Sequence, residues 1–521
     1  MSKAERDAYD ALMAIQVIEG LSNEVLLANI GRLIDLSGDL NQDAGTARAL
    51  EWCEILEKRS PPDPQAALLE YFRGNAWNNR RREKHRDKDA AWSWEQPELQ
   101  KEIFHLRRAV IHPGFDDLHP LRRCQTYTNL ANQMNTVGRF VEAVEYWDRA
   151  LSINPQFGKA LGNRGCGLVD YAVALYDTGH QALFCHLAYK ALNVALSSRA
   201  KYQDIDHKRA KKHYGAAKAR IEAKAKLGRR FDIDGHSIGA SEKERQYRQW
   251  CLENRLFLNP LNDLGPHSIA ARDILVLPGF VTSIDEPPTL IGFFNQMKQE
   301  FVSARWLYYE GVHAQRAHFS DRDVRLFNTL DYPSYGLAVE KTKAAFGITY
   351  SIFDKIGFFL NDYMRLGIDG NNVYFKTIWY RDYKKRELRP EFEESKNQPL
   401  RGLRWLAKDL FEKDFEDVME PDAEALYEIR NHLEHKYLKV HEMLIPQATG
   451  AMSSAWIDRL AHSVERQDFE AKTLRLLRLA RAGMIYLSLG MHREETRRRK
   501  AKGDTIVAPM TLDLWEDKWK R

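Results

Sequence analysis

The sequence lacks any apolar run that approaches the roughly 20 residues needed for a membrane-spanning helix, so we expect no membrane segment. Its first residues, MSKAERDAYDALMAIQ, also lack the basic-then-apolar layout of a secretory signal. Over 521 residues, the hydrophobic content of 44% and the charged content of 29% are typical of a soluble globular protein with two or three domains. We therefore expect a cytoplasmic protein.

Cysteine is scarce, and its spacing excludes two kinds of site. The five cysteines are odd in number and form no CxxC pair, so neither a disulfide framework nor a cysteine-based zinc site is predicted. We expect free and mostly buried thiols. They are Cys53, Cys124, Cys166, Cys185 and Cys251.

Neither sign of charge is in large excess, because the formal net charge is only +5. The basic residues are nevertheless clustered in the runs Arg80–Lys88, Lys208–Arg230 and Arg497–Lys502. Such runs are usually solvated helix faces. They would also attract phosphate groups without sequence specificity.

The first part of the chain contains helical pairs. One is predicted within 28–56 and a second within 65–111. The clearest pair lies at Tyr127–Pro155 and resembles the tetratricopeptide repeat (TPR) nearly position for position. The matching residues are Tyr127, Leu130, Ala131, Gly138, Phe140, Ala143, Trp147, Ala150 and Pro155. Small residues in this set let two helices approach closely, so residues 1–230 are predicted to form a TPR-like α-solenoid.

The remaining chain changes in character at two points. Residues 231–288 are rich in turns and are predicted to be an ordered connector, with ILVLPGF (274–280) as a strand-like run. Long amphipathic helices are then predicted over 289–500, followed by a tail at 501–521. The predicted fold class is therefore all-α, with an N-terminal solenoid and a C-terminal helical bundle.

The stretch Leu426–Val440, LYEIRNHLEHKYLKV, is predicted to be one of these bundle helices. Pro421 and Asp422 precede it in the manner of a helix start, and Pro446 follows it. At 3.6 residues per turn, one face of this helix is apolar and is expected to face the core. That face comprises Leu426, Ile429, Leu433, Tyr437 and Val440.

The other side of the same helix carries Arg430, Asn431, Glu434 and His435, which spell R-N-x-x-x-H. His435 lies about 140° around the helix from Arg430. At that position it does not pack on the apolar face of the helix, so packing gives little reason for a histidine there. Two interpretations are open. Arg430 and Glu434 could form an ordinary i,i+4 ion pair beside a solvated His435, or the group could carry chemistry.

The string R-N-x-x-x-H resembles the signature of the HEPN family, whose helical domains commonly act as metal-independent endoribonucleases. Together with the upstream repeat, the chain is similar to a prokaryotic branch of that family with N-terminal TPR repeats. The resemblance implies RNA as the substrate, Arg430 and His435 as catalytic residues and Asn431 as an orienting group. Glu434, one turn from Arg430, is expected to be a supporting residue. The resemblance also implies a homodimer that builds its site across the motif helix.

The residue types suit that chemistry. A histidine can act as an acid or a base near neutral pH, and an arginine can hold two phosphate oxygens and stabilise charge at phosphorus. Glu434 could raise the pKa of a nearby imidazole or pair with Arg430. Further polar candidates on the preceding helices are Lys298, Asp354 and Asn361.

The histidines of this stretch could also bind a metal. His432 and His435 are three residues apart and could share a cation, but no nearby cysteine or acidic cluster completes a ligand set. We therefore expect neither a metal nor another cofactor.

Two functions follow from the sequence. The first is a ribonuclease effector, typical of prokaryotic toxins or antiphage defence, in which the TPR half binds a protein or peptide that the sequence does not identify. The alternative is a non-catalytic TPR–HEPN adaptor that binds RNA, a nucleotide or a partner protein without cleaving RNA.

Overall fold

The protein is all-α, as predicted from the sequence. The computed structural model describes residues 3–85, 92–202, 207–224, 230–283, 286–327, 329, 331–411, 423–442, 460–502 and 510–520. Its helices are α1 (Lys3–Met13), α2 (Asn23–Leu40), α3 (Asp43–Lys58), α4 (Asp63–Lys84), α6 (Pro97–Ile111), α7 (Pro120–Thr136), α8 (Phe140–Ile153), α9 (Gly158–Ala174), α10 (Thr178–Leu196), α11 (His207–Lys224), α12 (Glu242–Glu253), α13 (Thr289–Val312), α14 (Leu337–Tyr363), α15 (Pro390–Glu393), α16 (Gln398–Phe411), α17 (Ala423–His435) and α18 (Arg466–Lys502).

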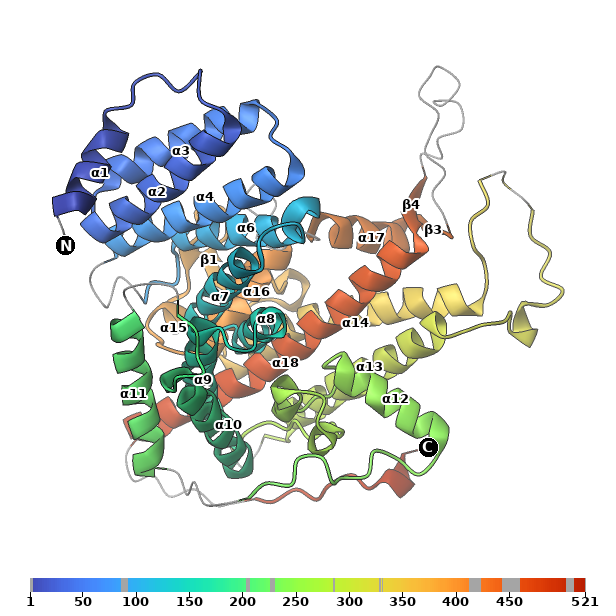
Figure 1. Cartoon of the computed structure of the whole chain (residues 1–521). Helices are drawn as coiled ribbons and strands as arrows, with labels where there is room; N and C mark the ends of the chain where they lie inside the picture. The colour runs from blue at the N-terminus through green and yellow to red at the C-terminus, as the bar shows by residue number, and fades with distance from the viewer. Residues whose placement is uncertain are drawn as a thin grey trace.

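The helices α1 to α11 form the N-terminal part and follow one another in contacting pairs (Figure 1). In the predicted repeat, α7 and α8 pack together and are joined by a tight turn at Gly138. The φ of 88° at this residue is favourable only for glycine. Ala131, Ala143 and Ala150 are fully buried, which allows the close approach that the sequence predicted. The assignment of this part as a TPR solenoid stays a prediction.

Short strands interrupt the helices at two places in the described residues. β1 (Tyr380–Asp382) pairs antiparallel with β2 (Glu387–Leu388), and β3 (Tyr437–His441) pairs parallel with β4 (Ala461–Glu465). The strand-like prediction for 274–280 was wrong. That run forms no strand among the described residues, and the Leu275 N–H donates a hydrogen bond to the Leu258 carbonyl.

Buried charges join the N-terminal and C-terminal parts of the chain. Asp409 of α16 is fully buried and accepts hydrogen bonds from Arg107 of α6, at 2.6 Å, and from Arg139, the residue before α8. The backbones also approach closely here, since a Cβ on Gly402 would lie 2.4 Å from the Gly138 carbonyl oxygen. Because an unpaired buried charge is costly, these contacts fix α16 against the N-terminal helices.

The long helix α18 crosses the middle of the molecule and contacts α13, α14 and α16 on the way (Figure 1). Its Arg481 forms a buried ion pair with Asp263, at 2.6 Å, and the Tyr171 hydroxyl of α9 donates to the same carboxylate. The motif helix α17 lies near the start of α18, beside β3 and β4 (Figure 1).

Two further expectations concern the cysteines and the absence of a membrane-spanning helix. All five cysteines are free, and Cys53, Cys124 and Cys251 are buried. Among the residues described, none of the helices combines the length and the apolar character that crossing a membrane requires.

Candidate active site

The motif helix α17 is shorter than the sequence predicted. It ends at His435, and the chain continues as strand β3 from Tyr437, so Tyr437 and Val440 are not part of a helical apolar face. The parallel register with β4 runs from Tyr437 opposite Ala461 to His441 opposite Glu465. The helical periodicity was misleading because residues 437–441 pair with a strand that is distant in the sequence. The expected boundary residues Pro421, Asp422 and Pro446 lie outside the described residues.

The apolar face of α17 is confirmed over its first two turns. Leu426 and Ile429 are buried, and Leu433 is half-buried. His432 is buried as well, which the sequence analysis did not anticipate. These side chains hold α17 against α14, α16 and the small sheet. Of the predicted site residues, Glu434 and His435 are exposed, whereas Arg430 and Asn431 are partly buried.

Arg430 is held by two kinds of contact. Its Nη2 lies 2.6 Å from Oε2 of Glu434, one turn along the helix. Its guanidinium carbon lies 5.6 Å from the ring centroid of Tyr350 on α14, a cation–π distance. Its Nε is buried and has no hydrogen-bond partner among the described residues. The guanidinium is therefore positioned from two helices and retains an unused donor.

His435 and Asn431 complete the motif at the end of the helix. The His435 side chain is 69% exposed, and its Nε2 lies 3.8 Å from Oε2 of Glu434. Asn431 Oδ1 lies 3.5 Å from Nη1 of Arg430, at the outer limit of a hydrogen bond. Glu434 Oε2 thus lies between the guanidinium and the imidazole. Glu434 therefore pairs with Arg430, as one of the two sequence interpretations predicted, and its carboxylate also lies near the His435 ring.

Asp354 of α14 joins this group, as one of the three additional candidates. Burial raises the pKa of its carboxyl, although a hydrogen bond from the Phe375 N–H and the charge of Arg430 lower it in part and Glu434 raises it further. Burial also raises the pKa of Tyr350, against the opposing charge of Arg430. The sequence gives no sign of this role for Tyr350, since an aromatic residue on an amphipathic helix is usually core.

The other two candidates lie elsewhere. Asn361 bonds the loop after α14 through both of its amide atoms, donating to the Ile368 carbonyl at 2.9 Å and accepting from the Ile368 N–H at 3.1 Å. Burial lowers the pKa of Lys298, while the charge of Asp273 raises it. Asn361 is therefore a loop-fixing residue, and Lys298 lies in the surroundings of Asp273.

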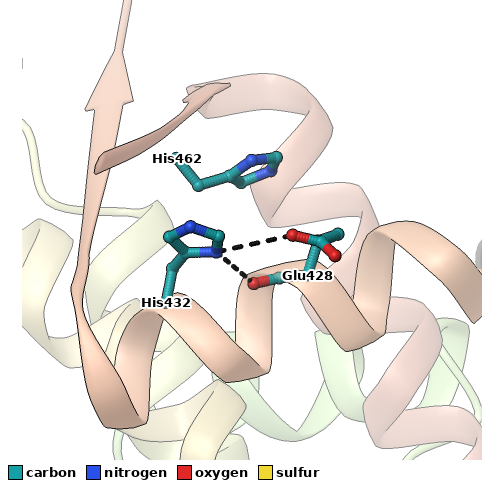
Figure 2. A group of neighbouring side chains, drawn as sticks. All are labelled: Glu428, His432 and His462. Carbon is teal, nitrogen blue, oxygen red and sulfur yellow. Dashed lines mark hydrogen bonds and ion pairs between the residues drawn. The ribbon is translucent and has the colours of Figure 1, made fainter. Parts of the chain in front are cut away.

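A second polar group lies on the other side of α17. Glu428 and His432 of the helix and His462 of β4 each offer a ligand atom, and these atoms lie within 4.8 Å of one another (Figure 2). Burial lowers the pKa of His462, and the neighbouring His432 lowers it further. The spacing in the sequence places His432 near His435. In the structure its histidine neighbour is His462, which β4 brings close.

The helix α17, which carries R-N-x-x-x-H, packs against the bundle helices α14 and α16. Residues 281–494 match the family described as LA2681-like HEPN. This part of the chain is therefore a HEPN domain, a class that is typically ribonuclease or otherwise RNA-related. Comparison with curated proteins and with solved structures finds no match.

Proposed function

We propose that the protein is a metal-independent endoribonuclease of the HEPN type, with Arg430 and His435 as its catalytic residues. The observation that carries the proposal is the position of the Glu434 carboxylate. Its Oε2 lies 2.6 Å from the Arg430 guanidinium and 3.8 Å from the His435 imidazole. A carboxylate between two such groups marks a place where an RNA phosphate oxygen would be bound by the same donors.

The proposed chemistry is attack within the RNA strand. A base removes the proton of a 2′-hydroxyl, and its oxygen attacks phosphorus to form a 2′,3′-cyclic phosphate. The bond from phosphorus to the 5′-oxygen breaks, and an acid returns a proton to that oxygen. His435 would act as one of these groups, Arg430 would stabilise the charge on the phosphate, and Asn431 would orient either the phosphate or the imidazole.

A second copy of the chain would supply the other proton-transfer group. α17 presents one exposed histidine, His435, because its other histidine, His432, is buried. Acid and base must stand on opposite sides of one phosphate, so we propose a homodimer built across α17. A two-fold axis there would bring a second Arg430 and His435 to the same cleft.

The N-terminal helices would control this activity. A TPR-like surface is suited to peptides or protein termini, and the buried ion pairs of Asp409 connect it to the HEPN bundle. We propose that a protein or peptide ligand of the N-terminal part gates RNA cleavage. Such an effector would suit a cytoplasmic prokaryotic toxin or an antiphage-defence protein.

The test uses total RNA and four single variants. Arg430→Ala and His435→Ala should each abolish cleavage. Arg381→Ala and His318→Ala are matched controls, because Arg381 also pairs with one glutamate and exposed His318 contacts its own turn; both should cleave like the wild type. Full cleavage by either motif variant would overturn the proposal.

The melting temperatures of the same variants separate catalysis from folding. His435→Ala should change the free energy of unfolding by no more than about 0.5 kcal/mol, as an exposed substitution does. Arg430→Ala should cost about 1 kcal/mol more, since its guanidinium packs on Tyr350.

The alternative is a non-catalytic adaptor, and one observation favours it. Glu434 already neutralises Arg430 in the free chain, which is the arrangement of an ordinary surface pair. A protein that binds RNA in an Arg430-dependent manner but leaves it intact, in every oligomeric state, would support the adaptor.

A further inference from the structure

The second polar group on α17 has the composition of a metal site. Glu428 and His432 are four residues apart on the helix, and His462 reaches them from β4 (Figure 2). Two imidazoles and one carboxylate are donors that first-row divalent transition metals prefer. Magnesium and calcium prefer oxygen donors throughout, so the group does not suit them.

The tautomer of His432 is fixed by a hydrogen bond. Its Nδ1 lies 2.8 Å from the backbone carbonyl oxygen of Glu428 and 3.6 Å from Oε2 of the same residue (Figure 2). A carbonyl oxygen only accepts, so Nδ1 carries the proton, and the lone pair of the neutral ring lies on Nε2. Histidines that bind metals commonly donate their other ring N–H to a carbonyl in this way.

Packing alone gives little reason for this cluster. The His432 side chain is only 11% exposed, and its ring centroid lies 5.1 Å from that of His462. Two adjacent imidazoles repel each other when both are protonated, and apolar side chains would fill the same space at less cost. A shared cation would satisfy both rings, and Glu428 would offset its charge.

We propose that Glu428, His432 and His462 form a binding site for a divalent transition-metal ion of the zinc class. In a tetrahedral zinc site the ligand atoms lie roughly 3.4 Å apart, so the present set, within 4.8 Å, must close by at most about 1.4 Å on binding. Rotation of the half-exposed Glu428 side chain supplies part of that movement. Three protein ligands leave the fourth position for water.

The ion would tie two segments that are distant in the sequence. α17 leads directly into β3, and β4 is the parallel partner of β3, with Leu438 opposite His462. A metal bound between α17 and β4 therefore stabilises the strand pairing and fixes the orientation of α17. This role is structural, and it does not rest on the proposed ribonuclease activity.

Cobalt provides the probe, since Co²⁺ fits zinc sites and absorbs visible light when it is tetrahedral. The experiment titrates CoCl₂ into the full chain, prepared without a histidine tag and stripped of metal, in the presence of a weak competing chelator. The wild type should bind one ion with a visible absorption band. ZnCl₂ should displace the cobalt and raise the melting temperature.

Two ligand variants and two controls complete the design. Glu428→Gln and His462→Gln should each weaken cobalt binding at least ten-fold and remove the melting shift. Glu434→Gln and His435→Gln change the same residue types at the end of the same helix and should bind like the wild type. Glu428→Gln leaves the side-chain volume almost unchanged, so it stays informative if His462→Gln does not fold. A wild type with no band, or equal affinity in Glu428→Gln, would overturn the inference, whatever the outcome for RNA cleavage.

Discussion

The Arg430 guanidinium and the Glu434 carboxylate are paired across one turn of α17, with Nη2 2.6 Å from Oε2. The Glu434 side chain is 44% exposed and that of Arg430 30%, so solvent screens the pair and RNA can compete for it. A phosphate that binds Arg430 must displace this carboxylate. The pair therefore lowers the affinity of the proposed site for anions by a small amount.

Removing that carboxylate charge should strengthen RNA binding. Exposed pairs of this kind contribute about 0.3–0.5 kcal/mol, so Glu434→Gln should bind RNA about two-fold more tightly and lose a similar amount of stability. Binding to a non-cleavable 2′-deoxy oligonucleotide measures the first quantity. Glu387→Gln, which breaks the exposed pair with Arg381, is the control. Weaker binding by Glu434→Gln would show that the carboxylate contributes to the site directly.

Asp354 should make stability depend on pH. Burial raises its pKa in the folded protein, so the folded state holds this proton more tightly than the unfolded state does. The resulting stability is present below the unfolded pKa of about 3.9 and is lost as the pH rises through the folded pKa. Asp354→Asn removes the cost of the buried charge and should raise the melting temperature at pH 7.

The matched control for that prediction is Asp362→Asn, an exposed aspartate on the same helix. The advantage of Asp354→Asn over the wild type should shrink as the pH falls toward 4. A melting temperature below that of the wild type at pH 7 would mean that the charged carboxylate stabilises the site, through Arg430.

The sequence predicted most of the bundle helices, whereas the roles assigned to the residues on α17 stay predictions. Amphipathic spacing located the bundle helices α13, α14, α16 and α18, and small residues located the pair α7–α8. Strands β3 and β4 were missed because each is short and takes its partner from a distant segment, which local periodicity does not encode.

Contacts between distant elements account for the other differences. Tyr350 and Asp354 meet Arg430 only through the packing of α14 on α17. His462 reaches His432 only through the register of β4. Neither group can be predicted from the spacing of residues within one segment, since the residues that form it come from different parts of the sequence.

The HEPN part alone should not behave like the full chain. Asp409, Arg404 and Lys408 of α16 are buried and pair with Arg107, Arg139 and Glu95 of the N-terminal part. Residues 289–521 should therefore be either unfolded, because these charges lose their partners, or hyperactive, if the bundle folds without its control. Circular dichroism and RNA integrity in expressing cells are the measurements. A folded fragment with the activity of the full chain would contradict gating.

The active form should be a dimer whose RNA affinity falls with salt. Two Arg430 side chains in one cleft attract phosphate, and screening weakens that attraction. Sedimentation over a concentration series should show activity rising with the dimer fraction, and Arg430→Ala should reduce the salt dependence of RNA binding. A stable monomer that cleaves RNA at full rate would end the composite-site proposal.

The chemical nature of the RNA ends tests the central claim most directly. Wild-type protein incubated with a defined RNA in excess EDTA should give fragments with 2′,3′-cyclic phosphate and 5′-hydroxyl ends, because His435 and Arg430 act without a metal in the reaction. Mass spectrometry of the fragments identifies both ends. Cleavage that requires Mg²⁺, or products with 3′-hydroxyl and 5′-phosphate ends, would contradict the proposed mechanism.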